Sequence, residues 1–154
     1  MRKHTYLITL AVLSTLTLAP ALMSSPAFAV DDDTSTGSVD LTSVRAKIEA
    51  KDYKAALAEL RGLAEDNQEA DVYNLLGYTL RKTGDYDTSL TYYNKALALQ
   101  PDYKPAREYL GELYVETGHM DKAHEQLAAL AKLCPSGCEE REDLEKAIAG
   151  KATD

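Results

Sequence analysis

One pattern in this chain occurs twice at a fixed spacing. The stretch TGDYDTSLTYYNKALALQP begins at Thr83, and TGHMDKAHEQLAALAKLCP begins at Thr117. Both copies open with Thr-Gly, carry a small residue six places on, and end on a proline. Self-similarity at a period of about 20 to 50 residues is typical of chains built from stacked repeats. This period limits the possible folds more strongly than any other feature of the sequence.

Apolar residues follow helical spacing in and around both copies. Before the first copy they recur at i, i+3, i+4, i+7 and i+8, on one side of a helix, as Val72, Leu75, Leu76, Thr79 and Leu80. A second stripe consists of Tyr86, Leu90, Tyr93 and Leu97. Between them, Gly84 suits a helix end and Asp85 suits the next N-cap. The same order of apolar stripe, glycine turn and second stripe returns one period later, and no strand pattern is found. We therefore expect an all-α chain of antiparallel helix pairs.

Two glycines lie inside the expected helices at the same period. Gly77 and Gly111 occupy helix interiors, where glycine costs about 1 kcal/mol relative to alanine. Glycine at both positions, despite this cost, indicates that two helices approach closely there. We expect the facing small residues to be Ser89 and Ala123, on the second helix of each pair.

These residues resemble the tetratricopeptide repeat, a helix pair of about 34 residues with aromatic, Leu-Gly, small and proline positions. The first unit fills them with Tyr73, Leu76, Gly77, Leu80, Ser89, Tyr93, Ala96 and Pro101. The next unit fills them with Leu110, Gly111, Tyr114, Ala123, Leu127, Leu130 and Pro135, and departs from the family's first aromatic position at Arg107. The resemblance implies a short solenoid of antiparallel helix pairs.

The ends of this solenoid depart from the pattern. Residues 51–57 match residues 84–90 one position short of the full period, and Gln68 stands where proline is expected, so the first repeat is degenerate. Leu144, Ala147 and Ile148 share one face of a final helix, which Gly150 would close. We expect repeats at about 39–69, 70–103 and 104–137, a capping helix at 138–149, and a tail at 151–154.

Residues 1–29 have the features of a secretory signal peptide. Arg2 and Lys3 precede a long uncharged run, and Ala27 and Ala29 supply the small residues of a cleavage site. A membrane anchor is the alternative, but the run is rich in Ser and Thr and is interrupted by Pro20. We expect an exported bacterial protein, in the periplasm or outside the cell, with residues 30–38 as a flexible acidic linker.

Charge and motif content narrow the function. Without Arg2 and Lys3 the chain keeps 15 of its 17 basic residues against 25 acidic ones, which disfavours nucleic acid and anionic lipid as partners. His119 and His124 are five positions apart, not the four that place two ligands on one helix face. No phosphate loop, nucleophile elbow or zinc spacing is present. The sequence therefore predicts no enzyme activity, no cofactor and no metal site.

Cys134 and Cys138 flank a Pro-Ser-Gly turn. In an oxidising compartment they can form a disulfide that ties the capping helix to the last repeat. The alternatives are a thiol-redox or redox-sensing pair and two free thiols. The spacing is C-x-x-x-C, whereas catalytic pairs are usually C-x-x-C, and the acidic residues after Cys138 disfavour a reactive thiolate.

The resemblance also implies a function, because the concave groove of this family binds a protein segment. The residues that match groove positions are Arg45, Asn74, Tyr78, Arg81, Lys82, Glu108 and Glu112. The Lys and Asn set with which some members clamp a C-terminal carboxylate is not reproduced, since Leu41 and Glu112 occupy two of its places. We expect a protein-interaction module of unknown oligomeric state. The alternatives are the redox role of Cys134 and Cys138, and a structural subunit of an envelope assembly.

Overall fold

The computed structural model describes residues 38–151, and these residues form seven helices without a strand. The helices are α1 (Thr42–Glu49), α2 (Tyr53–Asp66), α3 (Ala70–Lys82), α4 (Tyr86–Leu99), α5 (Lys104–Glu116), α6 (Met120–Leu133) and α7 (Glu139–Lys151). The predicted signal peptide, nearly all of the linker, and the last three residues lie outside the described residues. Within residues 38–151 no helix is long and apolar enough to cross a membrane.

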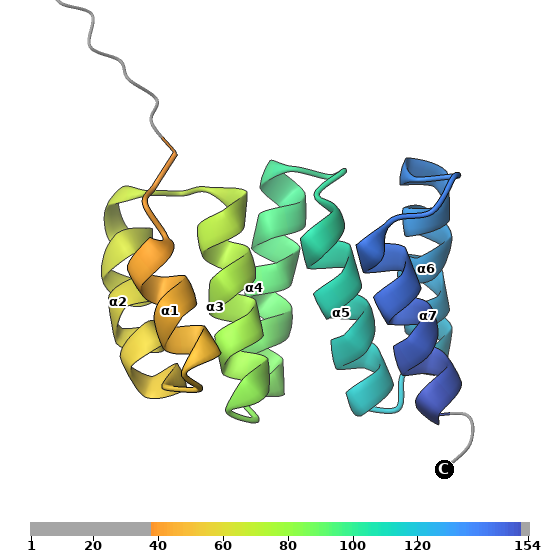
Figure 1. Ribbon diagram of the computed structural model, residues 1–154, viewed down its shortest axis with the longest axis horizontal. Helices are drawn as coiled ribbons and strands as arrows, with labels where there is room; N and C mark the ends of the chain where they lie inside the picture. The colour runs from red at the N-terminus through yellow and green to blue at the C-terminus, as the bar shows by residue number, and fades with distance from the viewer. Residues whose placement is uncertain (1–37, 152–154) are drawn as a thin grey trace, which may run out of the picture. The chain divides into compact units, whose positions relative to one another are not determined.

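Successive helices run antiparallel and stack in the order of the sequence (Figure 1). The inner helices, α1, α3, α5 and α7, lie on the side facing the viewer, and the outer helices, α2, α4 and α6, lie behind them. Each of α1, α3 and α5 packs against the outer helix that follows it, and α2 with α3 and α4 with α5 join one pair to the next. The predicted all-α solenoid of helix pairs with a C-terminal capping helix is confirmed.

The turn inside each pair has the chemistry that the sequence predicts. Gly84 and Gly118 adopt left-handed φ angles of 85° and 78°, which glycine takes at little cost. The Asp85 side chain caps α4 by accepting the Thr88 N–H at 3.3 Å. The first repeat departs here, because Lys51 takes the left-handed position with a φ of 59°.

The two interior glycines mark close helix contacts, but with different kinds of neighbour. A Cβ atom on Gly77 would stand 2.6 Å from the Tyr93 ring of α4, and Ser89 donates its hydroxyl to the Gly77 carbonyl at 2.7 Å. A Cβ atom on Gly111 would stand 2.5 Å from Leu144 of α7. Besides packing on α6, as predicted, α5 thus approaches the capping helix closely at Gly111, which the sequence did not predict.

The helix ends differ slightly from the prediction. The first helix begins at Thr42 instead of near residue 39, and α7 continues through Gly150 to Lys151, so Gly150 does not close it. Cys138 lies just before α7 and accepts the Glu142 N–H with its carbonyl at 3.0 Å. Leu144 and Ile148 of α7 are buried with Val115, Ala123 and Leu130. Helix α7 therefore covers the apolar face of the last repeat.

Candidate functional site

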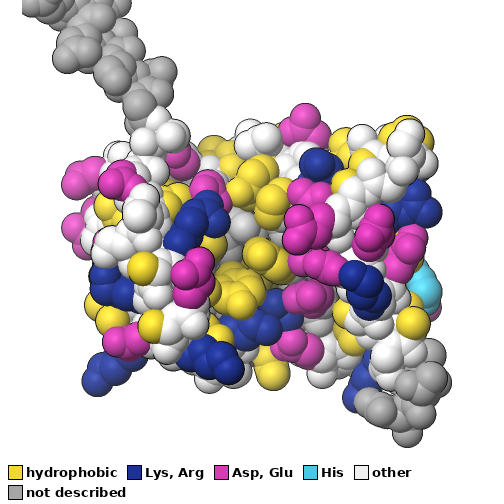
Figure 2. All heavy atoms as spheres, viewed as in Figure 1, with side chains coloured by type: hydrophobic (Ala, Val, Ile, Leu, Met, Phe, Trp, Pro, Cys, Tyr) yellow, Lys and Arg dark blue, Asp and Glu magenta, His cyan; other side chains and the backbone are white. Residues whose placement is uncertain are grey.

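The inner helices share a hollow in which apolar side chains gather. Figure 2 shows these side chains over α3, between α1 and α5, with acidic side chains collected toward α5 and α7. The hollow holds a cavity of about 170 Å³ lined by Arg45, Ile48, Glu49, Leu75, Tyr78 and Tyr109. These six residues come from three successive inner helices, and we call the space that they line the inner hollow.

Tyrosines form the most distinctive part of the inner hollow. The Tyr78 and Tyr109 rings lie 5.0 Å apart between centroids with their planes 52° apart. The Lys82 ammonium stands 5.3 Å from the Tyr78 centroid. Both rings are half-buried, so they offer apolar area and a hydroxyl to a partner.

Arg81 lies beneath this surface instead of projecting from it. Its side chain is buried, with 3% of the residue exposed. Nη1 donates to Glu116 at 2.6 Å, and Nη2 donates to Glu112. The guanidinium also lies 5.6 Å from the Tyr78 centroid and 5.8 Å from that of Tyr109. Arg81 therefore supports the tyrosines from below, and the predicted meeting of basic and acidic groups is an internal tie between two repeats.

A second polar tie crosses the repeats at the opposite end of α3. Arg45 of α1 donates to Asp71 Oδ2 at 2.6 Å, and the Tyr103 hydroxyl donates to Asp71 Oδ1 at 2.7 Å. Asp71 thus joins α1 to the segment that enters α5. The charge of Arg45, a residue predicted for the groove, is partly compensated by this contact.

Asn74 and Glu108 are the two remaining predicted groove residues, and both are buried. Asn74 is 2% exposed and its Oδ1 has no hydrogen-bond partner in the described part of the chain. Glu108 is 8% exposed. Burial, and then the charges of Glu112, Asp143 and Glu140, raise the pKa of Glu108 to about 8, against an opposing effect of Arg81.

The predicted set is therefore divided by depth. Arg45 and Tyr78 line the inner hollow, Lys82 is exposed beside Tyr78, and Glu112 is half-buried in its ion pair. Asn74, Arg81 and Glu108 lie below the surface. Sequence reasoning missed Ile48, Glu49, Leu75 and Tyr109. Leu75 and Tyr109 belong to apolar stripes that were assigned to the core, and Ile48 lies one helical turn after Arg45.

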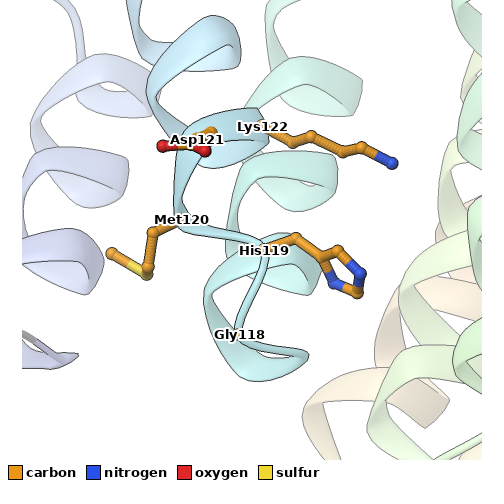
Figure 3. A pocket seen from close by; sticks show the side chains of 5 residues that line it. All are labelled: Gly118, His119, Met120, Asp121 and Lys122. Carbon is orange, nitrogen blue, oxygen red and sulfur yellow. The ribbon is translucent and has the colours of Figure 1, made fainter.

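The loop between α5 and α6 forms another hollow. About 320 Å³ in volume, it is bounded by Gly118, His119, Met120, Asp121 and Lys122. Figure 3 shows that the Met120 side chain points away from those of His119 and Lys122. His119 has Nδ1 3.0 Å from the Thr117 hydroxyl. Among residues 38–151 no cluster of His, Cys, Asp or Glu could hold a metal ion.

The cysteine pair lies away from the inner hollow. The structure joins Cys134 to Cys138 by a disulfide, with Cα atoms 6.0 Å apart. The bridge spans the connection from α6 to α7, and both residues are half-buried. It therefore links the last repeat to the capping helix.

Comparison with known proteins identifies one repeat directly. Residues 70–103, which contain α3 and α4, match the tetratricopeptide repeat family. The α3–α4 unit is a tetratricopeptide repeat. The next tetratricopeptide-like unit, α5–α6, follows it at the predicted period. The protein ycf37 of Guillardia theta is 37% identical over 54 residues, which are 35% of this chain. The chain spans 30% of the length of that relative.

Solved structures share this tetratricopeptide-like architecture. The translocator chaperone SycD of Yersinia enterocolitica has a TM-score of 0.61 at 15% identity, over 73% of this chain and 85% of SycD. PcrH, solved with the chaperone-binding region of PopB, has a TM-score of 0.60 at 16% identity, over 71% of this chain and 89% of PcrH. MamA has a TM-score of 0.58 at 19% identity, over 73% and 74% of the two chains. At these identities the likeness concerns the fold alone.

Proposed function

We propose that this chain is a non-enzymatic adaptor that binds a segment of another protein in the inner hollow. The observation that carries the proposal is the pair of half-buried tyrosines, Tyr78 and Tyr109, held on successive inner helices. Tyrosine is enriched at the energetic centres of protein interfaces because it offers a rigid apolar ring with a polar end. The family to which the α3–α4 repeat belongs is generally a non-enzymatic scaffold, and PcrH, which shares the fold, was solved with a region of PopB.

We further propose that the adaptor acts in the bacterial cell envelope, in the periplasm or outside the cell. The charged start, uncharged run and Ala27–Ala29 pattern support export. The disulfide between Cys134 and Cys138 also supports it, because such bonds persist in oxidising compartments. The acidic surface supports a protein rather than nucleic acid or anionic membrane as the partner.

Photocrosslinking in the native host tests the adaptor role. A photoreactive phenylalanine analogue replaces either Tyr78 in the inner hollow or Tyr86, which is exposed on the outer helix α4. We expect the probe at position 78 to trap a defined protein that the probe at position 86 does not trap. Tyr78→Ala should then weaken capture of that protein by about tenfold or more, while Tyr86→Ala should not. Equal trapping from both positions would contradict binding in the inner hollow.

A further inference from the structure

Glu108 is a buried carboxyl group that lacks a partner. It lies on α5 with 8% of its surface exposed, and its carboxyl group makes no hydrogen bond or ion pair with another described residue. Neither carboxyl oxygen of Glu108 is among the fully buried atoms that lack a partner, so the group keeps access to solvent, but burial of the residue weakens its solvation. Such a group on a face that already has a hollow points to a ligand that would supply the missing contact.

The cations near Glu108 pair with its acidic neighbours, and Arg81 keeps a buried Nε–H without a partner among residues 38–151. The charges that act on Glu108 are Glu112 on its own helix, Glu140 and Asp143 on α7, and Arg81 on α3. Each of the three acidic neighbours has its own cation: Arg81 for Glu112, Lys104 for Glu140 at 3.6 Å, and Lys146 for Asp143 at 2.8 Å. Arg81 is further shared with Glu116. Three carboxylates raise the pKa of Glu108 and Arg81 lowers it, so these surroundings favour an added positive charge beside the group.

In the preceding repeat, a fully buried acceptor at the matching place lacks a partner among the described residues. Asn74 lies one repeat period before Glu108, is 2% exposed, and has an Oδ1 without a hydrogen-bond partner in the described chain. Both unsatisfied groups carry acceptor oxygens. A ligand that satisfies them must therefore donate hydrogen bonds, as ammonium, guanidinium and backbone N–H groups do.

The inner hollow supplies apolar surface next to this acceptor. Tyr109 follows Glu108 in the chain, and the carboxyl group is one of the charges that raise the pKa of Tyr109 to about 12, after burial as the main cause. Tyr109 lines the cavity together with Leu75 and Tyr78. An apolar side chain placed in this cavity would contact Tyr109, the chain neighbour of Glu108.

We propose that the partner segment carries a Lys or Arg that pairs with Glu108, beside an apolar residue that fills the inner hollow against Leu75, Tyr78 and Tyr109. This inference rests on the proposed adaptor function and adds the chemistry of the partner. A cation placed beside Glu108 favours its ionised form, and the acidic groups around it repel an acidic segment. The specificity is thus opposite in sign to a clamp that holds a carboxylate.

Three short peptides test the inference by NMR on the full, ¹⁵N-labelled chain. They are the acetylated, amidated peptides LKYKL, LQYQL and LEYEL, which differ only in charge. We expect LKYKL to shift the amide signals of Glu108 and Tyr109. It should bind at least about fivefold more tightly than LQYQL, and the difference in affinity from LEYEL should be larger still. Glu108→Gln should weaken LKYKL by about tenfold and leave LQYQL unchanged.

A matched substitution separates the site from the general acidity of the chain. Glu125→Gln makes the same carboxyl-to-amide change at an exposed position on the outer helix α6, and it should leave LKYKL affinity unchanged. Equal binding of LKYKL and LQYQL, an equal effect of both substitutions, or no shift at Glu108 and Tyr109 at millimolar peptide would overturn the inference. The adaptor function is judged separately by the crosslink from position 78, so either proposal can fail alone.

Discussion

Substituting alanine for Gly77 measures how closely α3 and α4 approach. In helix interiors the change from glycine to alanine gains about 1 kcal/mol of helix stability. At Gly77, however, the added methyl group would lie 2.6 Å from two ring carbons of Tyr93, and Tyr93 is fully buried. Overpacking of this kind costs about 1–3 kcal/mol. We therefore expect Gly77→Ala to lower the free energy of unfolding by up to about 2 kcal/mol.

Gly62 provides the matched control. It lies inside α2, and a Cβ atom built on it meets nothing within 4 Å. Gly62→Ala should therefore raise the free energy of unfolding by up to about 1 kcal/mol. Urea unfolding followed by circular dichroism gives both values, provided that the m-value is unchanged. If Gly77→Ala stabilises the protein as much as Gly62→Ala does, the close contact with Tyr93 does not constrain the fold.

Two further predictions concern Glu108 and the cysteine pair. The pKa of Glu108 is raised from 4.5 to about 8, so between these pH values the folded chain keeps a proton that the unfolded chain loses. The free energy of unfolding should therefore fall as pH rises from 4.5 to about 8, and Glu108→Gln should remove this part of the fall. Urea midpoints at pH 5 and pH 8.5 test this, and parallel pH dependence in both proteins would contradict it. Protein recovered without reductant should have the intact mass of a chain that begins at Val30, and Cys134 and Cys138 should resist alkylation. Reduction should lower the free energy of unfolding by about 2 kcal/mol. Alkylation of the native, unreduced protein would instead favour the redox role.

Much of the fold could be predicted because the constraint is local and repeated. The repeat period, the apolar stripes and the glycine turn at Gly84 each depend on neighbours within one helix pair. The contact of Gly111 with Leu144 could not be predicted in the same way. The last repeat is followed by a single helix, and the residue that covers Gly111 there depends on how that helix packs and not on the repeat.

The sequence did not indicate how deeply the candidate site residues lie. Helix periodicity put Asn74, Tyr78 and Arg81 on one face of α3, and the resemblance made that face the groove, but neither gave a measure of burial. Arg81 is buried because Glu112 and Glu116, from the following repeat, compensate its charge. Burial of this kind depends on groups that are distant in the sequence, and the pattern within α3 does not contain it.

The polar ties of Asp71 and Arg81 have a consequence for how the inner hollow selects a partner. They lie toward opposite ends of α3, and each connects α3 to another inner helix or to the segment that enters it. The exposed tie through Arg45 weakens in salt, whereas the buried guanidinium of Arg81 is screened much less. The spacing between α3 and α5 is therefore set at both ends before any partner arrives. A segment that binds there meets a hollow of fixed width, and little free energy is spent on ordering the hollow. Affinity then depends mainly on how well the segment fits.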